Sequence, residues 1–102
     1  MAKRLRIEGR VQGVGYRAFF AKKARGLGLR GWVRNRADGT VEAGIDGDPD
    51  AIDAMMAWAA KGPPSAKVSR VSTEELTAEQ LFAEPLATEA TPDRPFAVLP
   101  TL

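Results

Sequence analysis

The chain of 102 residues predicts a small α+β domain whose strands and helices follow the order β-α-β-β-α-β. Two observations support this prediction. Apolar residues alternate with polar ones in several short segments, and two longer segments repeat apolar residues at helical spacing. A chain of this length is near the commonest size of a single domain and buries about two thirds of the surface exposed on unfolding. We therefore expect one domain over residues 1–102, with no need of a disulfide or a structural metal.

The first strand and the loop after it lie near the start of the chain. Leu5, Ile7 and Val11 alternate with charged residues, which is typical of a strand with one buried face. Gly13 and Gly15 then interrupt the alternation. Two glycines in so short a stretch predict a loop that uses positive φ angles.

Two amphipathic helices are predicted from the spacing of apolar residues. The first carries them at positions 16, 20, 24 and 27 and is expected to end at Gly26 or Gly28. The second begins after Asp48, an N-cap residue followed by proline at the first helical position, and ends at Gly62. Its apolar stripe consists of Ile52, Met55, Met56 and Ala59.

A hairpin is expected between the two helices. Trp32 and Val33 lie in a short apolar strand, and the pair Asp38-Gly39 is typical of a tight hairpin turn. The returning strand, over residues 40–46, alternates apolar and polar side chains.

A further strand is predicted over residues 67–74, where the three-residue spacing of Val68 and Val71 is compatible with a bulge or with a late start of the strand. Residues 76–95 are expected to form an extended loop before the last strand. Within them, Thr77 and Gln80 have the spacing of a capping box for a short helical turn.

The apolar run at residues 96–99 predicts an edge strand that Pro100 terminates. The whole order matches the ferredoxin-like βαββαβ pattern. Right-handed crossovers would then place two helices on one face of a mostly antiparallel sheet, with the extra C-terminal strand at its edge.

The residue types that the chain lacks exclude several kinds of catalysis. There is no histidine and no cysteine. Ser-His-Asp and Cys-His mechanisms and the usual zinc ligands are therefore excluded. We expect no metal and no cofactor, and any enzyme here would work by positioning and electrostatics, or with carboxylates.

Charge is unevenly distributed along the sequence. Residues 1–36 hold 11 of the 15 lysines and arginines and only one acid, Glu8. This pattern suits either two solvated faces of opposite sign or an anion site in the first third, for nucleic acid or a small phosphate. No segment resembles a secretory signal or a membrane span, so we expect a soluble, cytoplasmic protein.

The segment from Gly9 to Arg17 suits a phosphate group. A glycine-rich loop that leads into a helix can direct successive backbone N–H groups toward an anion, and the helix N-terminus adds its own unpaired donors. Arg17 adds a permanent charge and a planar fork that binds two phosphate oxygens. Taken alone, such a loop is also compatible with an ordinary turn.

Asn35 ends the strand that contains Trp32 and Val33. On its own, an asparagine here is most simply a turn residue. In the predicted topology, however, this strand is parallel to the first strand, with one strand between them. Asn35 is therefore expected at the same end of the sheet as the glycine loop, where it can face a bound phosphate.

These two segments resemble the signatures of the acylphosphatase family. Residues 9–17, Gly-Arg-Val-Gln-Gly-Val-Gly-Tyr-Arg, look like the first signature. Residues 31–35, Gly-Trp-Val-Arg-Asn, followed by Gly39, Val41 and Gly47, look like the second. The resemblance covers about residues 3–75, and residues 96–101 are similar to the closing strand of the family.

The resemblance implies a hydrolase that cleaves acyl phosphates to a carboxylate and inorganic phosphate. Arg17 and Asn35 would be the catalytic residues: Arg17 binds the phosphate, and the amide of Asn35 orients the attacking water. An oxygen of the bound phosphate would accept the proton of that water. The phosphate cradle would consist of the backbone N–H groups of Gln12, Gly13, Val14, Gly15, Tyr16 and Arg17.

The same resemblance implies a monomer that acts on a small acyl phosphate, with inorganic phosphate as product and competitive ligand and with no nucleic acid or membrane as partner. A ferredoxin-like RNA-binding module is the main alternative. It is disfavoured because the first and third predicted strands have no aromatic residue for base stacking. A phosphate- or carbamoyl-phosphate-handling domain of a larger enzyme is a second alternative.

Overall fold

The computed structural model describes residues 1–83 and 95–101 of the chain. Within them it contains a five-stranded sheet with the strand order β4-β1-β3-β2-β5, and three helices. The elements in chain order are β1 (Ala2–Arg10), α1 (Tyr16–Gly26), β2 (Arg30–Asn35), β3 (Val41–Asp46), α2 (Pro49–Lys61), β4 (Lys67–Leu76), α3 (Ala78–Ala83) and β5 (Ala97–Val98).

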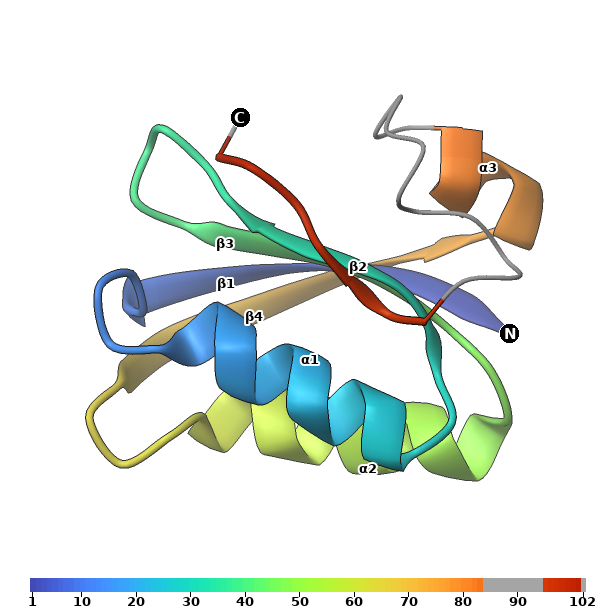
Figure 1. Ribbon diagram of the computed structural model, residues 1–102, viewed down its shortest axis with the longest axis horizontal. Helices are drawn as coiled ribbons and strands as arrows, with labels where there is room; N and C mark the ends of the chain where they lie inside the picture. Colours follow the sequence, from blue (N-terminus) through green and yellow to red (C-terminus); the bar gives the residue numbers. More distant parts are fainter. Residues whose placement is uncertain (84–94, 102) are drawn as a thin grey trace.

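The predicted ferredoxin-like fold is confirmed. The pairs β1–β3, β1–β4 and β2–β3 are antiparallel, and β5 pairs with β2 in parallel at the edge. Helices α1 and α2 cover one face of the sheet (Figure 1). The loop after β1 and the β2–β3 hairpin lie at the same end of the sheet, as the topology predicted (Figure 1).

The spacing of Val68 and Val71 in β4 reflects a bulge. Glu8 of β1 pairs with Arg70, but the next residue, Gly9, pairs with Val68, so β4 carries one extra residue at this point. Both valines pack against the core as a result. Gly9 is required here because a side-chain Cβ would lie 2.1 Å from the carbonyl oxygen of Lys67.

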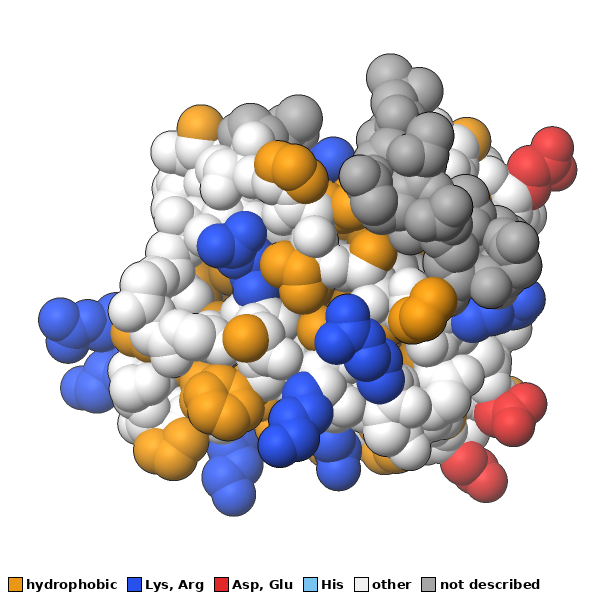
Figure 2. Space-filling view, in the orientation of Figure 1, with side chains coloured by type: hydrophobic (Ala, Val, Ile, Leu, Met, Phe, Trp, Pro, Cys, Tyr) orange, Lys and Arg blue, Asp and Glu red, His pale blue; other side chains and the backbone are white. Residues whose placement is uncertain are grey.

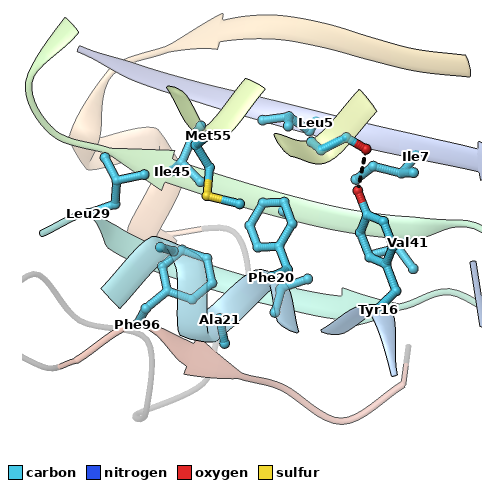
Figure 3. Close-up of a cluster of buried hydrophobic side chains, with 14 of the residues drawn as sticks. Leu5, Ile7, Tyr16, Phe20, Ala21, Leu29, Val41, Ile45, Met55 and Phe96 are labelled. Carbon is cyan, nitrogen blue, oxygen red and sulfur yellow. Dashed lines mark hydrogen bonds between the residues drawn. The ribbon is translucent and has the colours of Figure 1, made fainter. Parts of the chain in front are cut away.

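The main core lies between the sheet and the two long helices, and Figure 3 shows its central side chains. Phe20 of α1 stacks at a ring distance of 5.7 Å from Phe96, which precedes β5. The hydroxyl of Tyr16, at the start of α1, donates to the carbonyl oxygen of Ala59 in α2 at 2.7 Å. Trp58 contacts the rings of Tyr16 and Phe20 from α2. These contacts fix the N-terminal turn of α1 against α2.

Helix α3 lies on the opposite face of the sheet from α1 and α2 (Figure 1). The capping box is present: the Thr77 hydroxyl accepts from the N–H of Gln80, and the Gln80 side chain accepts from the N–H of Thr77. Leu81 is fully buried, and its carbonyl accepts a hydrogen bond of 2.9 Å from the indole of Trp32. Helix α3 therefore covers Trp32, which would otherwise be exposed on that face.

The segment 76–95 is thus not a loop throughout. Strand β4 runs two residues further than expected, to Leu76, and α3 follows it. The rest of the expected loop, residues 84–94, lies outside the described residues. Of the described helices, none is long and apolar enough to cross a bilayer.

Candidate active site

The glycine loop connects β1 to α1 and directs the start of that helix. Gly13 and Gly15 adopt φ angles of 75° and 80°, the left-handed region that other residues rarely use. Gly15 is the N-cap residue of α1 and offers no capping side chain. The backbone N–H groups of residues 12–16 donate to no backbone carbonyl of the described residues outside the helices and strands. These donors are therefore available to an anion.

The electrostatic environment of the loop is positive. Helix α1 has no acidic residue in its first turn, where a carboxylate would compete with an anionic ligand for the same donors. Lys and Arg side chains are spread over the face that α1 forms, and acidic side chains appear on it only at the edge far from the loop (Figure 2). The positive end of the α1 dipole adds to this field.

Arg17 lies in the first turn of α1 and reaches toward the edge of the sheet. Its Nη1 atom donates to the carbonyl oxygen of Leu99, just after β5, at 3.4 Å. Within the described part of the chain this is the one hydrogen bond of the Arg17 side chain, and it is long, so most of the guanidinium donors are available to a ligand. Arg25, on the same helix, makes a second contact with this segment: its Nε and Nη2 atoms donate to the carbonyl oxygen of Phe96, just before β5, at 3.0 and 2.6 Å.

Asn35 is the last residue of β2. Side chains alternate along the strand, so Asn35 lies on the face that carries α1, whereas Arg34 lies on the other face. The Oδ1 atom of Asn35 is buried and has no hydrogen-bond partner among the described residues. A buried acceptor without a partner destabilises the fold by about 1–3 kcal/mol, so this atom is suited to accept a hydrogen bond from a bound water.

The loop, Arg17 and Asn35 meet in one depression of about 220 Å³, which we call the loop depression. It is lined by Val11, Gly13, Gly15, Tyr16, Arg17, Ala18, Asn35 and Val98. Both predicted catalytic residues, and with them Gly13, Gly15 and Tyr16 of the predicted cradle, therefore line the same space. No acidic side chain is among the described residues that line it.

The hairpin that carries Asn35 is held by two sets of hydrogen bonds. The Nε2 atom of Gln12 donates to the carbonyls of Arg36 and Thr40 at 2.8 and 2.9 Å. At the turn, the hydroxyl and the N–H of Thr40 donate to Asp38 and hold the pKa of that carboxyl below its usual range. The position of Asn35 is therefore fixed by the glycine loop itself and by the turn.

A larger hollow, of about 580 Å³, lies on the other face of the sheet, over β1, β3 and β4. Its charges are mostly paired across strands: Arg4 with Glu74, and Arg36 with Glu42 at 3.1 Å. Glu42 also binds the buried Arg34 at 2.7 Å. This arrangement is that of a solvated sheet face, where cross-strand pairs neutralise one another. As far as the described residues define it, the loop depression has unpaired donors and no acid, so it is the better anion site although it is smaller.

Sequence reasoning missed three features of the loop depression. It assigned no contact to the side chain of Gln12, and it gave no role to Ala18 or Val98, which line the depression. The position of Ala18, directly after Arg17 on the same helix, was a signal that could have found it. Nothing local indicated the partners of Gln12, because they lie 24 and 28 residues away.

Fold and depression together are those of a small α+β domain suited to bind a phosphate group.

Comparisons with known proteins agree with this description. A family model described as Acylphosphatase matches residues 3–84. An acylphosphatase from Thermococcus kodakarensis is 57% identical over 70 residues, which cover 69% of this chain and 77% of the relative. The solved structure of an acylphosphatase from Coxiella burnetii has a TM-score of 0.79 at 34% identity and covers 96% of this chain and 90% of that one. For one from Bacillus subtilis the TM-score is 0.78 at 31% identity, with 96% and 97% covered.

The chain belongs to the acylphosphatase family. The resemblance seen in the two sequence signatures is thus confirmed, and the family match spans both of them.

Proposed function

We propose that this chain is an acylphosphatase that uses Arg17, Asn35 and the backbone of residues 12–17 to hydrolyse acyl phosphates. The observation that carries the proposal is the convergence of Arg17 and Asn35, 18 positions apart in the sequence, on the loop depression with Gly13 and Gly15. The reaction gives a carboxylate and inorganic phosphate.

Binding falls to the loop and to Arg17. Unpaired N–H groups of the glycine loop, which lies in a positive electrostatic environment, and of the helix N-terminus bind the non-bridging phosphate oxygens. Arg17 adds charge-assisted hydrogen bonds that strengthen as charge develops on the phosphate oxygens in the transition state. Catalysis then comes mainly from orientation and charge stabilisation, which contribute most of the rate enhancement in phosphoryl transfer.

Asn35 positions the nucleophile. Its buried Oδ1 accepts a hydrogen bond from a water and holds the water oxygen toward the phosphorus. The new bond joins the water oxygen to phosphorus, and the bond from phosphorus to the acyl oxygen breaks. A non-bridging phosphate oxygen takes the proton that the water loses, so the products are the carboxylate and dihydrogen phosphate.

The lining of the loop depression favours acyl phosphates over phosphate monoesters. An alcohol leaving group needs a proton, whereas a carboxylate is a weak base and leaves without one. The described lining offers no carboxylic acid or histidine as a donor. The Tyr16 hydroxyl donates to Ala59, and burial raises its pKa, so it is a poor acid. The site therefore fits a substrate that supplies its own good leaving group.

The proposal also covers the substrate class, the oligomeric state and the cellular location. We take the substrate to be a small molecule and the active form to be a cytoplasmic monomer, with no metal, cofactor, nucleic acid or membrane required. An RNA-binding role has little support, since Trp32 of β2 is buried beneath α3 and β1 and β3 carry no aromatic residue. Stacking on the open sheet face would need such residues.

Turnover of acetyl phosphate tests the proposal, with a phosphate monoester as the control substrate. We expect release of phosphate from acetyl phosphate that inorganic phosphate inhibits competitively and that chelators do not reduce. Hydrolysis of the monoester at a comparable rate, or activity that depends on added metal ions, would contradict the proposed mechanism.

A further inference from the structure

We propose that Val98 and Ala18 form the surface that contacts the acyl group, so that this chain prefers acyl phosphates with an apolar chain longer than acetyl. The inference rests on the proposed function and adds a substrate class to it. Both residues line the loop depression, and both are exposed within it.

The pairing of β5 with β2 explains why an apolar side chain points outward here. Val98 pairs with Val33, and the N–H of Leu99 donates to the carbonyl of Val33 at 2.9 Å. Ala97 and Leu99 turn toward Trp32 and are buried with it. Val98, between them, lies on the α1 side of the sheet at its edge and is 44% exposed.

The position of Val98, more than its exposure, indicates a role. Single exposed apolar residues are common and need no explanation. Of the three large apolar side chains exposed among the described residues, however, only Val98 lines the loop depression. It is held there from two sides, because Arg17 donates to the carbonyl of Leu99 and Arg25 donates to that of Phe96.

The orientation of a bound substrate brings its acyl group to this surface. The N–H groups of the loop and the fork of Arg17 occupy the phosphate oxygens, and Asn35 occupies the side of the attacking water. In-line displacement puts the acyl group on the side of the phosphorus opposite that water. We place it against Val98 and Ala18, the exposed side chains of the lining that bind neither the phosphate nor the water. Ala18 is small and leaves room beside α1, and Val98 provides an apolar wall.

The described lining contains no acidic side chain. It therefore neither repels a carboxyl-derived group nor favours an acyl group that carries a positive charge. Each methylene that an enclosed pocket buries discriminates by about 10- to 200-fold. An open wall such as that of Val98 buries less, so we expect a preference of a few-fold.

A comparison of acetyl phosphate with butyryl phosphate tests the inference. Their leaving carboxylates have nearly the same basicity, so the ratio of their kcat/KM values reports contact with the chain. Val98→Thr keeps the shape of the side chain and removes its apolar character. We expect the native protein to prefer butyryl phosphate a few-fold and Val98→Thr to bring the ratio close to one. Val71→Thr, a matched change in β4 outside the depression, should leave the ratio unchanged.

Competitive inhibition by inorganic phosphate, measured in parallel, shows whether the phosphate site is intact. An unchanged preference in a Val98→Thr protein that still binds phosphate would overturn the inference while leaving the proposed function in place. So would a native protein that hydrolyses both substrates with equal kcat/KM. If the native protein hydrolyses neither substrate, the proposed function itself fails.

Discussion

The side chain of Gln12 joins the phosphate loop to the strand end that carries Asn35: its Nε2 donates to the carbonyl of Arg36, the very next residue, at 2.8 Å. A second hydrogen bond, to Thr40 at 2.9 Å, spans the two sides of the hairpin. The residue that begins the loop therefore sets the distance between the loop and Asn35.

Gln12→Ala should lower kcat because Asn35 loses this connection to the loop. A shift of about 1 Å in a reacting group can reduce the rate as much as 100-fold, and we expect a loss of about 10- to 100-fold. Stability should fall by about 1–2 kcal/mol, since two hydrogen bonds are lost while the carbonyls of Arg36 and Thr40 keep the backbone N–H groups of Gly39 and Arg36 as donors. Steady-state kinetics and thermal melts measure the two effects.

A double-mutant cycle distinguishes positioning from general destabilisation. If Gln12 acts through Asn35, Gln12→Ala should have little further effect on kcat in an Asn35→Ala background. Gln80→Ala is the matched control, because that glutamine also makes a hydrogen bond but only within the cap of α3. Additive losses of activity in the double variant would show that Gln12 does not act through Asn35.

Arg17→Lys should impair both KM and kcat. Lysine keeps the charge but loses the planar fork, which binds the phosphate in the ground state and more strongly in the transition state. Arg25→Lys offers a matched control on the same helix, since Arg25 also donates to a carbonyl near β5 but does not line the loop depression. Equal kinetic effects of the two substitutions would mean that Arg17 serves only to hold β5.

The free energy of unfolding should decrease at high pH because of Tyr16. Burial raises its pKa in the folded state, so the unfolded chain releases the phenolic proton first. The stabilisation is therefore complete below the ordinary tyrosine pKa of about 10 and is lost as pH rises beyond it. Because Tyr16 is the only tyrosine, tyrosinate absorbance reports this residue alone.

Absorbance should stay that of the neutral phenol until the protein unfolds. In Tyr16→Phe the decrease of stability with rising pH should be shallower than in the native protein. A Tyr16 that titrates near its ordinary pKa in the folded protein would show that its hydroxyl is not held as the structure describes.

Sequence patterns predicted the fold well because they depend on local periodicity. The alternation in β1 and the helical stripes each reflect contacts with one buried face, and the Asp38-Gly39 turn reflects local backbone geometry. All six residues of β3 are buried, although its sequence alternates. The convergence of Arg17 and Asn35 also followed from topology, since β1 and β2 are both antiparallel to β3.

Other features depend on contacts that no local pattern encodes. Trp32 is buried by Leu81, 49 residues later, so α3 could be recognised from its capping box but not placed on the sheet. Asp48 stands at the N-cap of α2 as expected, yet its side chain makes no capping hydrogen bond. Its preference for that position stems from backbone geometry and the following proline rather than from a cap.

The most direct test of the proposed mechanism is the effect of Asn35→Ala on acetyl phosphate turnover and on phosphate inhibition, measured on the same folded sample. Asn35 is assigned to the water and not to the phosphate. We expect kcat to fall about 100-fold or more, as for the loss of one preorganised hydrogen-bonding group, while the inhibition constant for inorganic phosphate stays within about twofold. A folded Asn35→Ala protein, verified by its thermal melt, that keeps near-normal kcat would contradict the mechanism.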